Sequence, residues 1–342
     1  MTSLIDVRSM TRWVRDAGVG TIIRGMVEYL DDDFRRWERF DKVPRVASHT
    51  PFGVIELMPT SDGEEYAFKY VNGHPENPAR GFQTVTAFGV LADVHNGYPT
   101  FVAEMTLLTA LRTAATSALA ARALARPDSA VMALVGAGSQ SEFQAIAFRE
   151  MLGIESVRVF DTDPDAVVKL SRNLLPLGFE VTVASSAGHA ARGADIVTVC
   201  TADKTRAVVL SASDIDPGTH INALGGDCPG KTELDPAILS LGRVFVEYPP
   251  QTRIEGEIQQ MPESFPVTEL WRVLTGTEPG RVGRDEVTTF DSVGFAIEDF
   301  SALRFVRDQV AGTGYTTPID LIVAPDDPKD LFGLVGPLAP IG

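Results

Sequence analysis

The sequence predicts an α/β protein in which a doubly wound parallel sheet of the Rossmann type accompanies a separate α+β unit. From residue 131 onward, short apolar runs alternate with helical segments, as in a parallel sheet with right-handed crossover helices. Before residue 106, helices are followed by several short strands, an order that indicates an α+β unit. The 342 residues are enough for two such units, each with its own hydrophobic core.

The first part of the chain begins with helices and continues with strands. Apolar residues recur at intervals of three and four over residues 5–18 and 21–40, which predicts two helices. Short β-like runs separated by Pro, Gly and Asp follow, and antiparallel pairing is expected for them. An Ala- and Leu-rich helix then ends near Pro127 and can itself connect the two units. The expected strands are residues 45–49, 53–60, 66–72, 84–93 and 98–105, and the connecting helix is 106–125.

The second part alternates strictly between strands and helices. Residues 131–136 form a continuous apolar run, typical of a strand that is buried on both faces. Beyond residues 243–248 the pattern loosens into helices, and residues 325–342 are expected to be irregular surface chain. We therefore expect an α+β domain at residues 1–118, completed by residues 310–342, and a Rossmann-type domain at 119–309. The other expected elements are strands 156–160, 180–184, 195–200 and 220–225, and helices 141–153, 164–175 and 186–193.

Composition narrows the class of protein and its partners. Thirty Lys and Arg against 46 Asp and Glu give a net charge of −16, which argues against nucleic acid or anionic membrane surfaces as partners. Neither a signal peptide nor 18 uninterrupted apolar residues appears in the sequence. Two cysteines and no Cys/His spacing typical of zinc predict a reducing compartment and no metal site. A cytoplasmic protein is the expectation.

A dinucleotide site is predicted where the first strand of the second part ends. Gly136 and Gly138 form the G-x-G turn between a buried strand and a helix, and Ser141 stands where a third small residue is usual. Asp161 ends the next strand, where a carboxylate accepts hydrogen bonds from ribose hydroxyls and selects NAD over NADP. The alternative is a tight strand-to-helix turn in a sheet that binds nothing.

Asp227 is a candidate acid–base residue because it follows residues 220–226 at the carboxyl end of a later parallel strand. In open α/β sheets the ligand lies outside those carboxyl ends, so an acid there can face the nicotinamide end of a dinucleotide. A turn-forming Asp is the alternative. Lys231 can hold a cofactor oxygen or a substrate carboxylate, or be solvated. Cys228 is expected to be a small buried residue rather than a nucleophile.

Several stretches resemble the ornithine cyclodeaminase/μ-crystallin family over nearly the whole chain. They include "RVASH", "GVIELMP", "YAFKYVNGHP", "TALRTAATS", "DSVGFA" and "DDPKDLF". "GGDCPGKTEL" and "VEYPPQTRIEGEIQQ" resemble the cyclodeaminase branch in particular. That branch converts L-ornithine to L-proline and ammonia with an NAD that is returned to its starting state, so the resemblance implies this activity. A lysine cyclodeaminase, a net NAD(P)-dependent dehydrogenase or imine reductase, and a non-catalytic nucleotide-binding protein remain alternatives.

The resemblance also implies roles for individual residues. Asp227 is implied as the acid–base group, and Glu56 as the partner of the substrate's distal ammonium. Arg112 lies in an otherwise apolar helix, so it needs an anionic partner, which a bound carboxylate, a cofactor phosphate or a structural acid can provide. The residues implied for substrate are Arg45, Glu56, Lys69, Arg112 and Val293; those for NAD are Thr84, Arg112, Gly136, Gly138, Ser139, Gln140, Asp161, Thr201 and Lys231. The α+β domain is implied to bind substrate and to form a homodimer through its strands.

Overall fold

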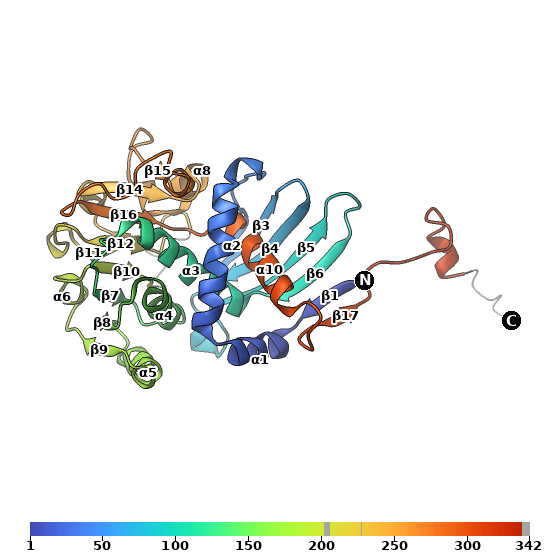
Figure 1. Cartoon of the computed structure of the whole chain (residues 1–342), viewed down its shortest axis with the longest axis horizontal. Coiled ribbons are helices and arrows are strands. Elements are labelled where there is room, and N and C mark those ends of the chain that lie inside the picture. Colours follow the sequence, from blue (N-terminus) through green and yellow to red (C-terminus); the bar gives the residue numbers. More distant parts are fainter. Residues whose placement is uncertain (202–205, 227, 337–342) are drawn as a thin grey trace.

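Two sheets organise the molecule, and Figure 1 shows them as two neighbouring lobes with helices α2 and α3 between them. The structure is a computed structural model that describes residues 1–201, 206–226 and 228–336. A seven-stranded sheet has the order β17-β1-β6-β5-β4-β3-β2, and an eight-stranded sheet has the order β15-β14-β16-β12-β10-β7-β8-β9. The predicted fold class, a Rossmann-type parallel sheet beside an α+β unit, is confirmed.

The seven-stranded sheet is antiparallel from β2 to β6, as the sequence predicts. Its first strand, β1, was missed, because a helix was expected from residue 5. Four residues are too few to show a periodic pattern, and β1 is held by parallel pairing with the distant β6. The strands are β1 Thr2–Ile5, β2 Val46–Thr50, β3 Gly53–Ser61, β4 Glu65–Gly73, β5 Val85–Asp93, β6 Pro99–Glu104 and β17 Thr317–Ile319.

Helices cover one face of this sheet and leave the other face open. Helix α10 packs against β3, β4 and β5, and α2 packs against α10. Along β3, Val54, Glu56 and Met58 are buried on the covered face, whereas Ile55 and Leu57 are exposed on the open face. This alternation is that of a strand with period two, but it places a charged residue on the buried side. The helices are α1 Val7–Ala17, α2 Val19–Arg35, α3 Thr106–Leu124 and α10 Ala296–Val310.

The eight-stranded sheet is parallel throughout and carries the Rossmann topology. One central strand, β16, lies between β12 and β14 in a region where only helices were expected. Its sequence, "VTTFD", is short and half polar, although all five residues are buried. The elements are β7 Val131–Val135, α4 Ser141–Leu152, β8 Ser156–Phe160, α5 Pro164–Leu174, β9 Glu180–Val183, α6 Ala187–Ala191, β10 Ile196–Val199, β12 His220–Ala223, α7 Pro236–Leu239, β14 Gly242–Val246, α8 Pro249–Glu255, β15 Thr268–Glu269, α9 Leu270–Leu274 and β16 Val287–Asp291. A separate pair is formed by β11 Arg206–Leu210 and β13 Thr232–Leu234.

Helix α3 joins the two sheets and is buried along nearly its whole length. Its many alanines let it pack closely against α2 and α4 on one side and α10 on the other. The predicted boundary at residue 118 falls inside this continuous helix, so the division into domains remains a prediction. Because α3 touches both lobes, a charged side chain on it can serve a site between them.

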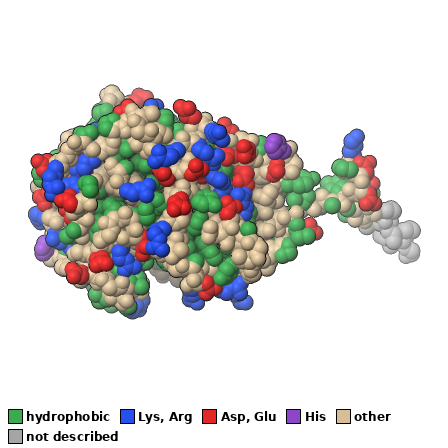
Figure 2. All heavy atoms as spheres, in the orientation of Figure 1, with side chains coloured by type: hydrophobic (Ala, Val, Ile, Leu, Met, Phe, Trp, Pro, Cys, Tyr) green, Lys and Arg blue, Asp and Glu red, His purple; other side chains and the backbone are tan. Residues whose placement is uncertain are grey.

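The C-terminal segment extends away from the body as an arm (Figure 1). After β17, only a short 3₁₀ turn, Phe332–Leu334, interrupts the irregular chain up to residue 336, in agreement with the expectation for this tail. Figure 2 shows acidic and basic side chains interspersed over the visible face of the body. Among the helices that the structure describes, none has the length and apolar character needed to cross a membrane.

Candidate active site

The turn between β7 and α4 is tight because Gly136 lies against the end of a neighbouring strand. Gly136 has φ +102°, and a Cβ there would lie 2.8 Å from the carbonyl oxygen of Cys200. Its own carbonyl accepts a hydrogen bond from the Cys200 thiol at 3.3 Å. Burial raises the pKa of Cys200 to about 12, so this thiol stays protonated and serves as a structural donor.

The space beyond this turn is open. A Cβ on Gly138 would meet nothing within 4 Å, and the N-terminus of α4 follows at once, so its free N–H groups face that space. Ser141 is fully buried and donates to the Gly138 carbonyl at 2.7 Å, which closes the first turn of the helix. The turn and its surroundings therefore fit the pyrophosphate of a dinucleotide, with Ser139 and Gln140 between the second glycine and the helix.

Asp161 sits beside the same turn, at the end of β8. Its Oδ2 accepts the Ala137 N–H at 2.6 Å, and its Oδ1 accepts the Asp163 N–H at 2.9 Å. The carboxylate is thus fixed by backbone donors and keeps further acceptor capacity on each oxygen. The structure places this predicted ribose-binding acid next to Gly136 and Gly138, as its proposed role requires.

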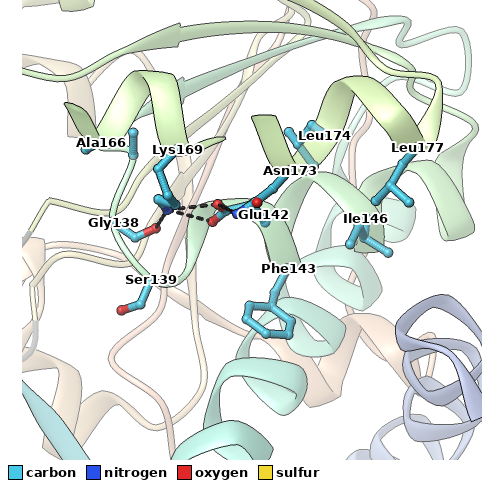
Figure 3. A pocket seen from close by; sticks show the side chains of 11 residues that line it. Gly138, Ser139, Glu142, Phe143, Ile146, Ala166, Lys169, Asn173, Leu174 and Leu177 are labelled. Carbon is cyan, nitrogen blue, oxygen red and sulfur yellow. Dashed lines mark hydrogen bonds and ion pairs between the residues drawn. The ribbon is translucent and has the colours of Figure 1, made fainter. Parts of the chain in front are cut away.

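A cavity of about 520 Å³ adjoins the glycine turn between α4 and α5 (Figure 3). On its polar side, Lys169 donates to the Gly138 carbonyl at 3.0 Å and pairs with Glu142 at 2.8 Å. Asn173 also donates to Glu142, at 2.8 Å. Lys169 was not predicted from the sequence, and its contact with Gly138 supports the backbone of the turn.

A cluster of buried charges lies where the seven-stranded sheet meets the carboxyl ends of the parallel strands. Lys69 on β4 donates to Asp299 on α10 at 2.8 Å. Arg112 on α3 pairs with Glu298 at 2.6 Å and with Asp299 at 3.0 Å. The prediction that Arg112 needs an anionic partner is therefore confirmed, and two acids of α10 meet the need.

Arg112 can approach the turn after β16 closely because that turn contains a glycine. Gly294 has φ +75°, and a Cβ at this position would lie 2.7 Å from Nη1 of Arg112. The adjacent Val293 is buried, and its assignment to the substrate remains a prediction. Glu247, at the end of β14, holds this turn by accepting the Ser292 hydroxyl at 2.6 Å and the Gly294 N–H at 3.2 Å.

Arg45 joins the cluster from the segment that precedes β2. Its Nη1 pairs with Glu56 at 3.2 Å and its Nε pairs with Glu255 at 2.9 Å. Its Nη2 donates to the carbonyls of Val293 and Gly294 at 2.6 and 2.8 Å. The structure thus brings Arg45, Glu56, Lys69, Arg112 and Val293 together, as the sequence interpretation requires.

Burial shifts the protonation of these groups. The pKa of Lys69 is lowered to about 8 by burial and by the nearby Arg112, which together outweigh its pairing with Asp299. Burial raises the pKa of Glu298 to about 8, against the opposing effect of Arg112. Burial also raises the pKa of Glu247. Such shifts are typical of groups that exchange protons or bind charged ligands.

Three carboxylate oxygens of the cluster are buried without receiving a hydrogen bond from the described residues. They are Glu56 Oε1, Glu298 Oε1 and Asp299 Oδ2, each buried without a hydrogen-bond partner among the residues that the structure describes. Buried acceptors of this kind are costly unless a donor meets them. The cluster is therefore suited to a ligand that carries positive charge as well as a carboxylate.

The loop after β12 carries the remaining predicted residues. Asp227 lies outside the described residues. Lys231 is buried, donates to the Thr201 carbonyl at 3.2 Å and lies 3.8 Å from Glu233 Oε1, so Lys231 and Thr201 are neighbours. Cys228 is buried, as predicted.

The motif "RIEGEIQQ" forms hydrogen bonds with the backbone of this loop. Glu257 accepts the N–H groups of Glu233 and Leu234 at 2.7 and 3.1 Å. Gln259 accepts the Gly230 N–H at 2.7 Å and donates to the Lys231 carbonyl at 2.8 Å. These hydrogen bonds hold the segment that contains Lys231 in place.

Thr84 lies apart from the glycine turn in the contacts that the structure describes. It precedes β5, is half-buried, and its carbonyl accepts the His74 N–H at 2.8 Å. Its assignment to the cofactor remains a prediction. In the described part of the chain, no group of three or more His, Cys, Asp or Glu could hold a metal ion.

Four acids of the cluster were not predicted from the sequence: Glu247, Glu255, Glu298 and Asp299. A signal existed for two of them, because Glu298 and Asp299 are acids within the apolar run "FAIEDFSALRF", much as Arg112 is a cation within an apolar helix. Glu247 follows the end of β14 and Glu255 is the last residue of α8, and an acid at such a place is common and carries no such signal.

Comparison with known proteins agrees with this geometry. The model of the ornithine cyclodeaminase/mu-crystallin family matches residues 7–314. Ornithine cyclodeaminase of Agrobacterium fabrum is 58% identical over 331 residues, which cover 97% of this chain and 94% of that protein.

Two solved structures share the whole architecture. An archaeal alanine dehydrogenase dimer with bound NAD superposes with a TM-score of 0.85 at 28% identity, over 94% of this chain and 99% of the other. A lysine cyclodeaminase, described as recognising L-lysine, L-ornithine and L-2,4-diaminobutyric acid, gives a TM-score of 0.85 at 30% identity, over 93% of this chain and 96% of the other.

Proposed function

We propose a function for this chain as a member of the ornithine cyclodeaminase/mu-crystallin family, to which it belongs. It is an ornithine cyclodeaminase, an ammonia-lyase that converts L-ornithine to L-proline and ammonia. The observation that carries this proposal is the 58% identity to an ornithine cyclodeaminase over 97% of the chain. The buried cluster of paired cations and acids, suited to a small zwitterion, supports it independently.

NAD is the proposed cofactor, and when bound it supplies reversible acceptance and return of a hydride. The turn at Gly136 and Gly138, with the backbone-held Asp161 beside it, fits the pyrophosphate and ribose of such a cofactor. Because Asp161 would repel a 2′-phosphate, NAD is preferred over NADP. The further residues proposed to contact NAD are Thr84, Arg112, Ser139, Gln140, Thr201 and Lys231.

The substrate's α-carboxylate is proposed to bind at the cationic side of the cluster. Lys69 and Arg112 approach the same point through Asp299, so both charges are held in a fixed arrangement. Arg45, on the other side of the turn at Val293, completes the set. Charge-assisted hydrogen bonds to a desolvated carboxylate each contribute about 1.5–3 kcal/mol.

Proton transfer is proposed to depend on Asp227, with Glu56 as its partner. Asp227 would take a proton from the α-ammonium and later one from the distal ammonium, so that the distal nitrogen can bond to the α-carbon and the α-nitrogen can leave as ammonia. Glu56, with its buried and unfilled Oε1, is proposed to orient that distal amine. Positioned bases of this kind contribute roughly 10²–10⁴ to the rate.

Incubation of the purified protein with ornithine and no added reductant tests the proposal. Proline and ammonia should form in equal amounts while absorbance of NADH shows no net change. Net formation or consumption of NADH would instead indicate a dehydrogenase or an imine reductase. Lysine is run in parallel, because the lysine cyclodeaminase of the same fold is described as recognising both diamino acids, and a single methylene changes binding by only about 1–3 kcal/mol.

A cytoplasmic homodimer is the proposed form of the protein. The open face of the seven-stranded sheet supports it, since it exposes the large apolar side chains of Val46, Leu57, Tyr66 and Phe88, one on each of the strands β2 to β5. The two cysteines, which form no disulfide, suit a reducing compartment.

A further inference from the structure

Arg45 is enclosed by two acids that come from different parts of the chain. Glu56 belongs to β3, and Glu255 ends helix α8 of the parallel-sheet lobe. Each of the three side chains is only 6% exposed, and Arg45 pairs with Glu56 at 3.2 Å and with Glu255 at 2.9 Å. One buried cation therefore stands between two buried carboxylates.

Helix α8 is built to reach this position. Gln251 and Glu255 lie one helical turn apart on the same face of α8, and both contact Arg45. The Oε1 of Gln251 accepts the backbone N–H of Arg45 at 3.0 Å, and the carboxylate of Glu255 pairs with its guanidinium. Gln251 also donates to the Gly294 carbonyl at 2.8 Å, the same carbonyl that accepts Arg45 Nη2. Glu257, two residues further, instead caps the backbone of Glu233, so the two acids of the motif have different tasks.

The acids around Arg45 include an oxygen for which the described residues supply no hydrogen-bond donor. Two carboxylates share one guanidinium, and Oε1 of Glu56 has no donor among the described residues. A cation that replaced Arg45 at this place could pair with both acids, whereas removal of Arg45 without replacement would take from each buried carboxylate the guanidinium that it contacts, which is strongly unfavourable.

We propose that Glu255 is a specificity-determining residue that, with Glu56, receives the distal ammonium of a diamino acid in exchange for Arg45. In this structure Arg45 lies between the two acids. When substrate binds, its ammonium takes that place, and Arg45 turns its freed edge toward the substrate's carboxylate. The inference rests on the proposed function, since it concerns the diamino acid of that reaction.

The exchange explains how the site rejects amino acids that lack a second amine. Norvaline, 2-aminopentanoic acid, has the carboxylate that draws Arg45 away but no ammonium to replace it. Two buried carboxylates would then lose the guanidinium that both contact, so norvaline should bind on the order of 100-fold more weakly than ornithine. A pocket that selected ligands only by their length would bind norvaline and ornithine with a much smaller difference in affinity, because the two molecules have the same carbon skeleton.

Glu255→Gln is the direct test, measured as kcat and KM for ornithine and as the inhibition constant of norvaline. We expect KM for ornithine to rise about 10- to 100-fold with a smaller change in kcat, while norvaline binds as well as before or better. Glu56→Gln should likewise raise KM for ornithine without weakening the binding of norvaline. Glu263→Gln, on the exposed chain just after the motif, is the matched control and should behave as wild type.

A variant that weakens ornithine and norvaline equally would overturn the proposal, because Glu255 would then only support the structure. Unchanged KM for ornithine would overturn it as well. If circular dichroism shows that Glu255→Gln does not fold, Glu255→Asp is used instead, because it keeps the charge on a side chain that is shorter by one methylene. For this variant we expect a smaller rise in KM for ornithine, again without weaker binding of norvaline. Should wild type form no proline, the proposed function fails, while binding of ornithine and norvaline by calorimetry still decides the role of Glu255.

Discussion

The cofactor side and the substrate side of this site are built by different means. Around Gly136, most of the contacts that shape the site involve backbone N–H and carbonyl groups. The residues that make them lie within about one strand–helix–strand unit of the sequence. Around Arg112, the site is formed by ion pairs between side chains that are remote in sequence. Asp299 lies 187 residues from Arg112 and 230 residues from Lys69 along the chain. A local site can be recognised as a motif, whereas a remote one exists only once the chain has folded.

The largest effect is expected at Asp227, the proposed acid–base residue. Asp227→Asn should keep the fold and NAD binding while lowering kcat by about 10²–10⁴, because the amide cannot take a proton from either amine. Proline formation from ornithine gives kcat, and NAD titration followed by protein fluorescence shows whether the cofactor side is intact. Near-normal turnover would remove Asp227 from its proposed role.

The substrate side should depend on Arg112 for stability as well as for binding. Arg112→Met leaves Glu298 and Asp299 with only Lys69 as a cation, so the free energy of unfolding should fall by about 3–5 kcal/mol. Urea unfolding measures the loss.

The double variant Arg112→Met with Glu298→Gln provides the control for this prediction. It removes one of the uncompensated acids and should recover part of the lost stability, since the two residues are in direct contact. A single variant that loses less than about 1 kcal/mol would mean that the pair is not important for stability.

On the cofactor side, Asp161→Ala should alter selectivity more than stability. Removing the carboxylate takes away an acceptor for ribose hydroxyls and the charge that repels a 2′-phosphate, so the preference for NAD over NADP should fall by about tenfold, equivalent to ~1.4 kcal/mol. Titrations with both cofactors give the ratio. The loss of the hydrogen bond to Ala137 predicts weaker binding of both, but an unchanged ratio would refute the selector role.

The contrast between the two sides also explains what could be predicted. Gly136, Gly138 and Asp161 were identified from spacing alone, and the fold class followed from alternating strands and helices. The cations Arg45 and Lys69 required a family resemblance, since alternation along β4 shows only that Lys69 faces inward. Their partners Glu255, Glu298 and Asp299 were missed, because no local pattern records which buried acid meets which buried cation.

The smallest expected effect tests whether Lys69 acts as a cation toward the substrate. Its pKa is lowered to about 8 by burial and by Arg112, so it is protonated below that pH and loses its charge as the pH rises through it. If Lys69 binds the substrate's carboxylate, KM for ornithine should increase several-fold above pH 8, while NAD affinity over the same range stays constant. Because an arginine remains charged there, Lys69→Arg should move the increase in KM to higher pH even if it binds less well at pH 7. An identical pH profile for the two proteins would show that another group, such as Glu298 with its pKa of about 8, controls substrate binding in this range.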